Sequence, residues 1–369
     1  MNVLTRLNHA TAKTFLHTDS IGSYLEPIIQ RFKPAWRTHW FRARVLSIKN
    51  LDGVVELLLS PEKHWPQAKA GQHVLLTLEV NGRLMTRPFS ISSGPQQLSN
   101  DHPRQRSIRL TIKVNTEGGF TPKIVESVLT QRVVNISAPQ GDFVTVDFPN
   151  NPVWFVAAGS GITPFLAMLH HLAHLASGSA RSGANHPIHL VYFAKALEHL
   201  YVDELLAISK VLPQLRLQLL VRQQGHHLSD ALLHCDPSSQ VFVCGPAQFK
   251  HAVDQQLDML LHPQQQRRAE YYQAPVVAQQ STGEHDVLVI QRGTSTLLTL
   301  TADDNLLTGL EQQGIRANFG CRIGVCHQCR CVKKSGVVRN LRTGELSQQG
   351  EQLIQLCISQ AVTSLELEL

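Results

Sequence analysis

The sequence predicts a multidomain protein with an antiparallel β-barrel, a doubly wound parallel α/β domain and a small α+β unit. Its 369 residues suit two or three domains, and a hydrophobic content of 43% is enough to form their cores. Short strands dominate residues 40–150, buried strands alternate with helices over 151–261, and four cysteines lie within residues 321–331. These three observations carry the fold prediction.

The β-barrel is predicted from short apolar runs that are bounded by Gly, Pro and Asn. These runs cover residues 54–59, 74–78 and 108–114. Short strands at this spacing are typical of an antiparallel barrel or sandwich. Residues 1–39 form a basic N-terminal extension, because the first 50 residues carry eight Lys or Arg against two acids and so hold the whole net charge of +6.

The parallel α/β domain is predicted from continuous apolar runs that alternate with helical stretches. Such strands occur at residues 153–157, 188–194, 215–221 and 241–244, and the first is followed by a predicted helix over 164–176. Strands buried on both faces and separated by helices indicate a doubly wound parallel sheet.

The last part of the chain is predicted to be a linker followed by a compact unit. Residues 262–284 are Gln-rich and break the periodicity, so we expect a linker there. Residues 285–369 contain, in order, two strands, a helix, a Cys-rich loop and a terminal strand over 364–369. The expected domain boundaries are therefore 1–39, 40–150, 151–261, 262–284 and 285–369.

Several classes of protein are disfavoured by the composition. No apolar run approaches the roughly 18 residues of a membrane span, and the N-terminus lacks the apolar core of a signal peptide. A cytoplasmic protein is therefore expected. No basic stripe runs through the body of the chain, so no nucleic-acid partner is expected.

The strongest chemical signal is a cysteine pattern near the C-terminus. Cys321, Cys326 and Cys329 follow the spacing Cys-x4-Cys-x2-Cys, and Cys357 follows after 27 intervening residues. This is the plant-type 2Fe–2S spacing, and thiolates are the soft ligands that iron–sulfur clusters use. A structural zinc site is the alternative, although such sites usually consist of two Cys-x2–4-Cys pairs. Cys331 is expected to be a structural thiol.

A second signal is a Gly-rich turn directly after the first strand of the α/β domain. Glycines let a phosphate approach the backbone closely, and the following helix attracts anions to its N-terminus. We expect Thr163 to cap that helix and Pro164 to lie in its first turn. An ordinary βα turn is the alternative. The turn contains Gly159, Ser160, Gly161, Ile162, Thr163 and Pro164, and the segment Cys244, Gly245 and Pro246 ends the last buried strand at the same predicted edge of the sheet.

A third signal lies in the β-barrel. Arg87 is suited to clamping a phosphate, Phe89 to stacking on a ring, and Ser90 to hydrogen bonding with a ring edge. Thr121 and Pro122 predict another helix start that favours anions. Ordinary packing of Phe89 beside Arg87 is the alternative. The two segments are Arg87, Pro88, Phe89 and Ser90, and Gly118, Gly119, Phe120 and Thr121.

The three signals together fit one kind of electron transfer. A nicotinamide delivers two electrons as a hydride, whereas a 2Fe–2S cluster accepts them one at a time. A flavin can hold two electrons and release them singly, so we expect one between the two sites.

These motifs resemble the ferredoxin–NADP⁺ reductase superfamily fused to a C-terminal plant-type ferredoxin domain, over residues 40–369. Residues 87–90 are similar to its Arg-x-Tyr-Ser flavin motif, with Phe89 in place of Tyr. Residues 118–121 resemble its flavin-phosphate loop, and 159–164 its nicotinamide-nucleotide loop. The resemblance implies a β-grasp-like ferredoxin domain. It also implies that Ser90 at the flavin and Cys244 beside the nicotinamide act in catalysis.

The resemblance also implies cofactors and partners. FAD is expected, with FMN as the alternative because phthalate dioxygenase reductase-like relatives share this domain order and use FMN. Lys195 and Arg222 follow the second and third buried strands, where family members bind an adenosine 2′-phosphate. This placement favours NADPH over NADH.

The expected electron acceptor is a metal-dependent oxygenase or a membrane desaturase. A fatty-acid desaturase is favoured because the basic, aromatic extension 1–39 suits peripheral contact with the inner face of a membrane. The alternative is the reductase of a soluble ring-hydroxylating dioxygenase or monooxygenase. An iron–sulfur redox sensor is an alternative of another class.

Overall fold

The structure is a computed structural model, and it describes most of the chain from residue 40 onward. The predicted flavin-phosphate loop, residues 118–121, and the basic extension lie outside the described residues. For residues 79, 80 and 83–85 the structure describes the backbone alone. The described ranges are 40–51, 53–80, 83–95, 107–114, 126, 128, 132–145, 151–177, 186–196, 198–260, 267–270, 283–291, 293–301, 304–324 and 326–369.

The first unit is an antiparallel sheet that closes on itself. Its strand order is β4-β3-β6-β1-β2-β5, and every neighbouring pair is antiparallel. A bridge between Ile91 and Leu110 joins the end of β4 to β5 and completes the barrel. The strands are β1 (Trp40–Leu51), β2 (Val54–Pro61), β3 (His73–Val80), β4 (Arg83–Ser90), β5 (Ile108–Lys113) and β6 (Val133–Ser137).

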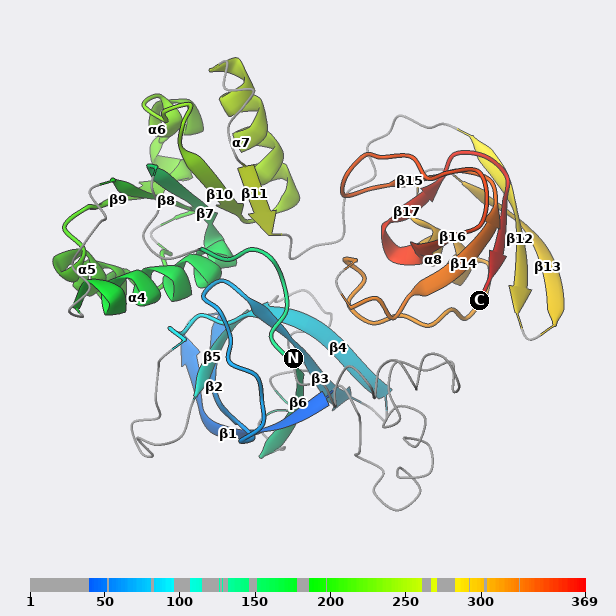
Figure 1. Cartoon of the computed structure of the whole chain (residues 1–369), viewed down its shortest axis with the longest axis horizontal. Coiled ribbons are helices and arrows are strands. Elements are labelled where there is room, and N and C mark those ends of the chain that lie inside the picture. Colours follow the sequence, from blue (N-terminus) through cyan, green and yellow to red (C-terminus); the bar gives the residue numbers. More distant parts are fainter. Residues whose placement is uncertain are drawn as a thin grey trace, which may run out of the picture.

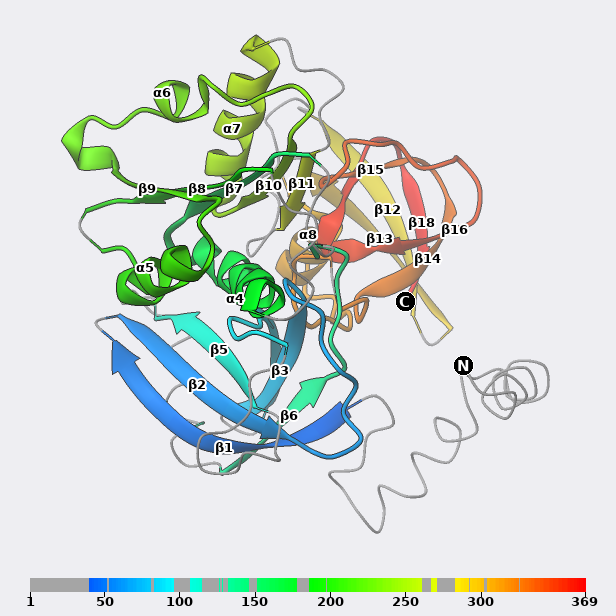
Figure 2. The same cartoon turned by 60° about the vertical axis from the view of Figure 1, so that its left-hand side comes forward.

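The second unit is a five-stranded parallel sheet with the order β11-β10-β7-β8-β9. Helices α4 and α5 lie between this sheet and the barrel, and α6 and α7 cover the other face (Figure 2). The strands are β7 (Val153–Ala158), β8 (Ile188–Ala194), β9 (Leu215–Val221), β10 (Gln240–Cys244) and β11 (Arg267–Glu270). The helices are α4 (Thr163–Ser177), α5 (Val202–Val211), α6 (Leu228–Leu232) and α7 (Ala247–Met259), with 3₁₀ turns η1 (Gly159–Ile162) and η2 (Arg222–Gln224).

Strand β11 corrects the predicted linker at 262–284. It pairs in parallel with β10 and extends the sheet by one edge strand. Its sequence, Arg-Arg-Ala-Glu, carries no run of apolar side chains, because an edge strand is paired on one side only. The hydrophobic pattern on which the prediction rested therefore could not reveal it.

The third unit is an α+β domain with the strand order β13-β12-β18-β14-β16. The terminal strand β18 runs parallel to β12 and antiparallel to β14, so the two ends of the unit meet in the middle of its sheet. Helix α8 begins after Asn305, whose Oδ1 accepts a hydrogen bond from the Thr308 amide at 3.0 Å. The elements are β12 (Glu284–Gln291), β13 (Thr294–Thr301), α8 (Leu306–Gln312), β14 (Arg330–Ser335), β15 (Val338–Asn340), β16 (Gln352–Gln355), η3 (Leu356–Ile358), β17 (Ser359–Ala361) and β18 (Leu365–Glu368).

The three units meet at a common junction, with the third unit beside β11 and β4 (Figure 1). A cluster of buried polar groups fastens the barrel to the parallel sheet domain. Arg109 of β5 donates from both terminal nitrogens to the Glu204 carboxylate, at 3.0 and 2.8 Å. The Tyr201 hydroxyl lies 2.7 Å from Thr111 Oγ1, and His170 also contacts Glu204.

No helix in the described part of the chain has the length and apolar character needed to cross a bilayer.

Candidate functional site

The two loops predicted to bind a nucleotide pack against each other at the carboxyl edge of the parallel sheet. Gly159 adopts a left-handed conformation with φ of +57° at the end of β7. A Cβ atom on Gly161 would lie 2.1 Å from the Cys244 carbonyl oxygen. Only glycine fits there, because the backbones of the two loops are in direct contact. A Cβ on Gly245 would lie 3.1 Å from that of Ala158, so the second loop is also closely packed, although less tightly than at Gly161.

The structure agrees with only part of what was predicted for the start of helix α4. Thr163 has helical backbone angles and is the first residue of α4, so the prediction that it caps the helix from outside is wrong. Its hydroxyl instead donates to the Ser160 carbonyl at 3.1 Å, because η1 brings the preceding turn directly under the helix. Pro164 lies in the first turn of α4 as predicted. Cys244 is fully buried, and Pro246 is the residue before α7.

Lys195 and Arg222 lie at the same edge of the sheet. Each directly follows a strand, β8 for Lys195 and β9 for Arg222, and both side chains are exposed. Because β8 and β9 are parallel neighbours, their carboxyl ends lie side by side. The arrangement suits two cations that would approach one phosphate from adjacent strands.

The predicted flavin motif forms the end of strand β4. Ser90 is buried, and its hydroxyl donates to Glu270 Oε2 at 2.9 Å. Arg87 Nη1 donates to the Thr86 carbonyl at 2.8 Å and to the Gly320 carbonyl at 2.9 Å. Burial, followed by repulsion from Arg322, lowers the pKa of Arg87. Phe89 is half-buried and packs against the barrel core, so it combines packing with a partly accessible ring.

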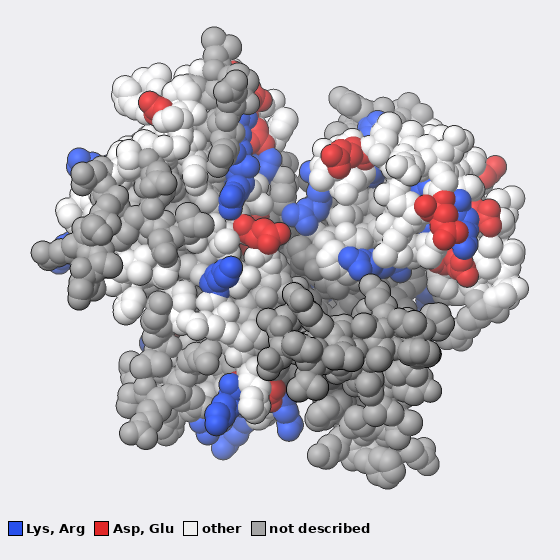
Figure 3. Space-filling view, viewed as in Figure 1, with Lys and Arg blue, Asp and Glu red and all other residues white. Residues whose placement is uncertain are grey.

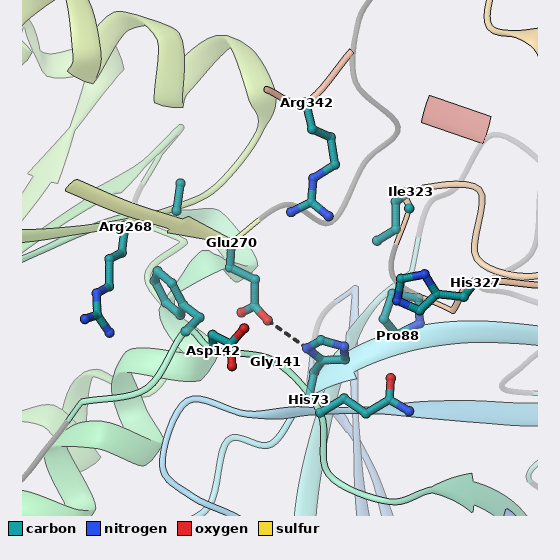
Figure 4. Close-up of a pocket in the computed structure, with 13 residues that line it drawn as sticks. His73, Pro88, Gly141, Asp142, Arg268, Glu270, Ile323, His327 and Arg342 are labelled. Atoms are coloured by element: carbon teal, nitrogen blue, oxygen red, sulfur yellow. Dashed lines mark hydrogen bonds and ion pairs between the residues drawn. The ribbon is translucent and has the colours of Figure 1, made fainter. Parts of the chain in front are cut away.

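Glu270 is a site residue that sequence reasoning missed. It lies at the end of the edge strand β11 and reaches the barrel, where its Oε1 is 3.1 Å from His73 Nδ1. Figure 4 shows this pair beside a cavity of about 890 Å³. Within the described residues, Nε2 of His73 is buried and has no hydrogen-bond partner. The His73–Glu270 pair thus joins the start of β3 to the end of β11 at the edge of the cavity.

The cavity is lined by all three units. His73 and Pro88 come from the barrel, Arg268 and Glu270 from the parallel sheet domain, and Arg342 from the third unit. Figure 3 shows Lys and Arg side chains on both sides of the hollow between the second and third units. The loop that carries Cys321, Cys326 and Cys329, called the cluster loop below, contributes Ile323, Gly324 and His327 to the cavity wall.

The four predicted cluster cysteines form two close pairs. The sulfurs of Cys329 and Cys357 lie 3.2 Å apart, although 27 residues separate them in the sequence. The Cys321 amide donates to Cys326 Sγ at 3.1 Å, and the Cys326 amide donates to Cys321 Sγ at 3.3 Å. Two pairs provide two thiolates for each of the two irons of a 2Fe–2S cluster. In the described residues no group of three or more Cys, His, Asp or Glu side chains converges on a single ion.

The surroundings of these sulfurs fit an iron–sulfur cluster. Backbone N–H groups point at sulfur, which is one way in which proteins tune such clusters, and the Ile323 amide adds a second contact to Cys321 Sγ at 3.5 Å. The contact between Cys329 and Cys357 lowers the pKa of Cys329 and raises that of Cys357, and the contact with Cys321 together with burial raises the pKa of Cys326.

Two neighbours of the cluster loop are not part of this donor set. Cys331 lies on β14 in the hydrophobic core, where burial raises its pKa to about 12. Lys333, also on β14, is fully buried. Its ammonium group donates to the carbonyls of Gly336 and Gln348 at 2.8 and 2.9 Å and also to Gly350. It therefore holds the turns beyond β14 together.

Three family models match successive parts of the chain. The oxidoreductase FAD-binding domain matches residues 53–145, and the oxidoreductase NAD-binding domain matches residues 155–255. The 2Fe-2S iron-sulfur cluster binding domain matches residues 290–362. The chain belongs to the ferredoxin–NADP⁺ reductase superfamily and carries a C-terminal 2Fe–2S ferredoxin domain. This reductase is a flavin-dependent NAD(P)H oxidoreductase.

Several known proteins are similar to this reductase over most of its length. An NADPH oxidoreductase of Mycobacterium tuberculosis is 27% identical over 334 residues, which are 89% of this chain and 84% of that protein. The phthalate 4,5-dioxygenase reductase subunit of Pseudomonas putida is 26% identical and covers 80% of this chain and 85% of its own. The tert-butanol monooxygenase / tert-amyl alcohol desaturase reductase subunit of Aquincola tertiaricarbonis is also 26% identical, with coverage of 79% and 84%.

Solved structures support the same fold. The structure of phthalate dioxygenase reductase matches with a TM-score of 0.57 at 19% identity, covering 89% of this chain and 98% of that one. A full-length cytochrome P450 from Tepidiphilus thermophilus matches with a TM-score of 0.56 at 19% identity. Its alignment covers 93% of this reductase but only 44% of the P450 chain.

Proposed function

We propose that this reductase transfers electrons from NADPH through FAD to its own 2Fe–2S cluster and then to a separate metal-dependent oxygenase. When bound, FAD accepts a hydride and releases its electrons singly to the cluster. The contribution of the chain is to bind the nucleotide, orient the two rings and hold the cluster close to the flavin.

The observation that carries this proposal is the contact between the flavin motif and the cluster loop. Arg87, on the predicted flavin strand, donates a hydrogen bond to the carbonyl of Gly320, which immediately precedes the first cluster cysteine. The bond joins residues that are 233 positions apart, and it is partly buried. A charged donor on a carbonyl is among the stronger protein hydrogen bonds, so it favours a docked ferredoxin domain.

The proposed roles of the site residues follow from their positions. We assign the nucleotide pyrophosphate to the loop 159–164 and the nicotinamide to the neighbouring segment 244–246. Ser90, oriented by the Glu270 carboxylate, is assigned to the reacting edge of the flavin, and Phe89 to its ring face. The phosphate-loop residues 118–121 remain a sequence-based assignment.

NADPH is the proposed electron donor. The exposed side chains of Lys195 and Arg222 follow adjacent parallel strands, where together they would neutralise a 2′-phosphate. The similarity to a protein named an NADPH oxidoreductase supports the same choice.

The proposed acceptor is an oxygenase rather than a membrane fatty-acid desaturase. The supporting relatives are named as reductases of phthalate dioxygenase, glycine betaine monooxygenase and tert-butanol monooxygenase systems. A desaturase remains the second candidate, because the Aquincola tertiaricarbonis relative is also named for the desaturation of an alcohol. The membrane contact of residues 1–39 predicts co-sedimentation with anionic vesicles that a deletion of residues 1–36 abolishes.

The electron path is tested with a variant of one cluster ligand and a matched control. Cys326→Ser should abolish the NADPH-dependent reduction of cytochrome c, while reduction of ferricyanide continues, because the flavin can pass electrons to a small oxidant directly. Cys331→Ser changes a buried cysteine two positions after Cys329 that belongs to no pair, so both activities should stay near the wild-type value. Full cytochrome c reduction by Cys326→Ser with no iron bound would refute the proposed path.

A further inference from the structure

A tyrosine inside the NAD-binding domain is hydrogen-bonded to the proposed nucleotide loop. Tyr192 lies on β8 and is fully buried. Its hydroxyl donates to the Gly159 carbonyl at 3.0 Å and accepts from the Leu200 amide at 3.0 Å. Nothing in the flavin or cluster chemistry described above uses this side chain.

The bond to Gly159 fixes the direction of a loop amide. The peptide unit between Gly159 and Ser160 is planar and trans, so its carbonyl and its N–H group point in opposite directions. When Tyr192 holds the carbonyl toward the interior, the Ser160 N–H must point away from the interior. Gly159 sits in the left-handed region, which glycine enters and leaves at little cost, so an external anchor is needed to keep this peptide in one orientation.

The anchor is itself held in place by the neighbouring strands. The His199 Nε2 atom lies 3.1 Å from the Tyr192 carbonyl and 3.2 Å from the Leu220 carbonyl on β9. The His199 ring also packs edge-on against the Tyr192 ring, with 4.9 Å between the ring centres. Residues 199–200 therefore tie the carboxyl ends of β8 and β9 to the tyrosine.

The hydroxyl keeps its proton under working conditions. Burial raises the pKa of Tyr192 to about 12, against an ordinary value of 10.0. The hydroxyl can thus donate to one backbone group while it accepts from another, as the two distances require.

We propose that Tyr192 is a positioning residue for the nicotinamide nucleotide: through its hydroxyl it holds the Gly159–Ser160 peptide in the orientation that receives the dinucleotide phosphates. The proposal rests on the assignment of loop 159–164 to the nucleotide. It predicts that loss of one hydroxyl group, with the ring retained, weakens nucleotide binding and leaves the later electron-transfer steps intact.

The test compares two tyrosine-to-phenylalanine variants of the complete holoenzyme. Tyr201 is a matched control, because its buried hydroxyl also makes two hydrogen bonds, to Thr111 at 2.7 Å and to Glu56 at 3.1 Å, but at the junction with the barrel. Tyr192→Phe should raise the KM for NADPH by about five- to tenfold, the worth of one buried hydrogen bond, and leave kcat within about twofold. The Kd of NADP⁺, measured by isothermal titration calorimetry, should rise by the same factor. Tyr201→Phe should leave both constants unchanged.

Two results would overturn the inference. One is a KM and a Kd for Tyr192→Phe that stay within about twofold of the wild type, and the other is an equal rise in Tyr201→Phe. Hydrogen exchange of the wild type with and without NADP⁺ separates this failure from failure of the loop assignment. If the nucleotide does not protect the amides of residues 159–164, the loop assignment is wrong. If it protects them and Tyr192→Phe still binds normally, only the role of Tyr192 is refuted.

Discussion

Replacing Glu204 with glutamine should loosen the junction between the flavin and nucleotide domains. Glu204 accepts hydrogen bonds from both terminal nitrogens of Arg109, whose side chain is only 11% exposed, and it also contacts His170. Burial alone would raise the pKa of the Glu204 carboxyl, but its hydrogen bonds with His170 and Arg109 outweigh this and lower it from 4.5 to about 2. A shift of this size corresponds to about 3 kcal/mol of stability at neutral pH. Glutamine would also remove the closer of the two carboxylates that face Arg109, and only Glu56, at 3.8 Å, would then be left to pair with its charge.

The loss should appear in thermal unfolding followed by flavin fluorescence, because the proposed flavin strand β4 belongs to the barrel that this junction fastens to the parallel sheet domain. For a unit of roughly 200 residues, about 3 kcal/mol corresponds to a fall in Tm of about 6–12 °C. Because the native pKa is depressed, the contribution is complete above pH 4.5 and is lost as the pH falls toward 2. The difference in Tm between the wild type and Glu204→Gln should therefore become smaller at acid pH. The control is Glu351→Gln, which breaks an exposed ion pair with Lys334 and should change Tm by about 2 °C or less. Equal Tm values for Glu204→Gln and the wild type at pH 7 would refute the reasoning.

Three further changes probe the proposed site. Gly161→Ala places a Cβ atom 2.1 Å from the Cys244 carbonyl oxygen, so it should push the two loops apart and raise the KM for NADPH at least about tenfold. The flavin and iron content of the variant should stay normal, and an unchanged KM would contradict the loop packing. The double variant Lys195→Ser/Arg222→Ser should raise the KM for NADPH about tenfold and leave that for NADH unchanged, whereas an equal effect on both would remove the 2′-phosphate assignment. Glu270→Gln exchanges the charged acceptor of the Ser90 hydroxyl for a neutral one, and it should slow flavin reduction by NADPH about fivefold in stopped-flow measurements. A rate equal to that of the wild type would argue against the proposal that Glu270 orients Ser90.

Much of the fold could be predicted because it depends on short-range patterns. Strands β8 and β9 occupy the predicted ranges. Strand β8 lies inside the sheet and is buried at six of its seven positions, so it appears as a largely apolar run, whereas β9 is an edge strand in which Arg216 and Gln218 alternate with leucines. The cysteine spacing predicted the third domain for a similar reason, because three of the candidate ligands lie in one loop. The family pattern includes a distant fourth cysteine, and the structure brings Cys357 within 3.2 Å of Cys329.

The missed features depend on contacts between distant segments. Glu270 lies in a polar edge strand within the predicted linker, and only the fold brings it to Ser90, which is 180 positions away in the sequence. The Arg109–Glu204 pair likewise joins two domains across 95 positions. Charged side chains are ordinarily exposed, but Lys333 is fully buried, and three backbone carbonyls replace the water around its ammonium group. No local pattern encodes such partners.

Arg87 connects the predicted flavin motif to the backbone of the cluster loop. A guanidinium group has five N–H donors in a fixed plane, and the Nη1 atom of Arg87 supplies those that hold Thr86 and Gly320. The same planar group is the proposed clamp for the flavin phosphate, so one side chain connects the flavin strand to the backbone of the cluster loop. Because the guanidinium is rigid, movement of the cluster loop would be transmitted to the flavin side of the motif. Because the ferredoxin and reductase domains are fused, this contact forms within one molecule. Two separate proteins would have to meet by diffusion, whereas fused domains are present at a high effective concentration relative to each other. In the proposed electron path the cluster is the last carrier within the protein, so the cluster loop must also be accessible to the external oxygenase.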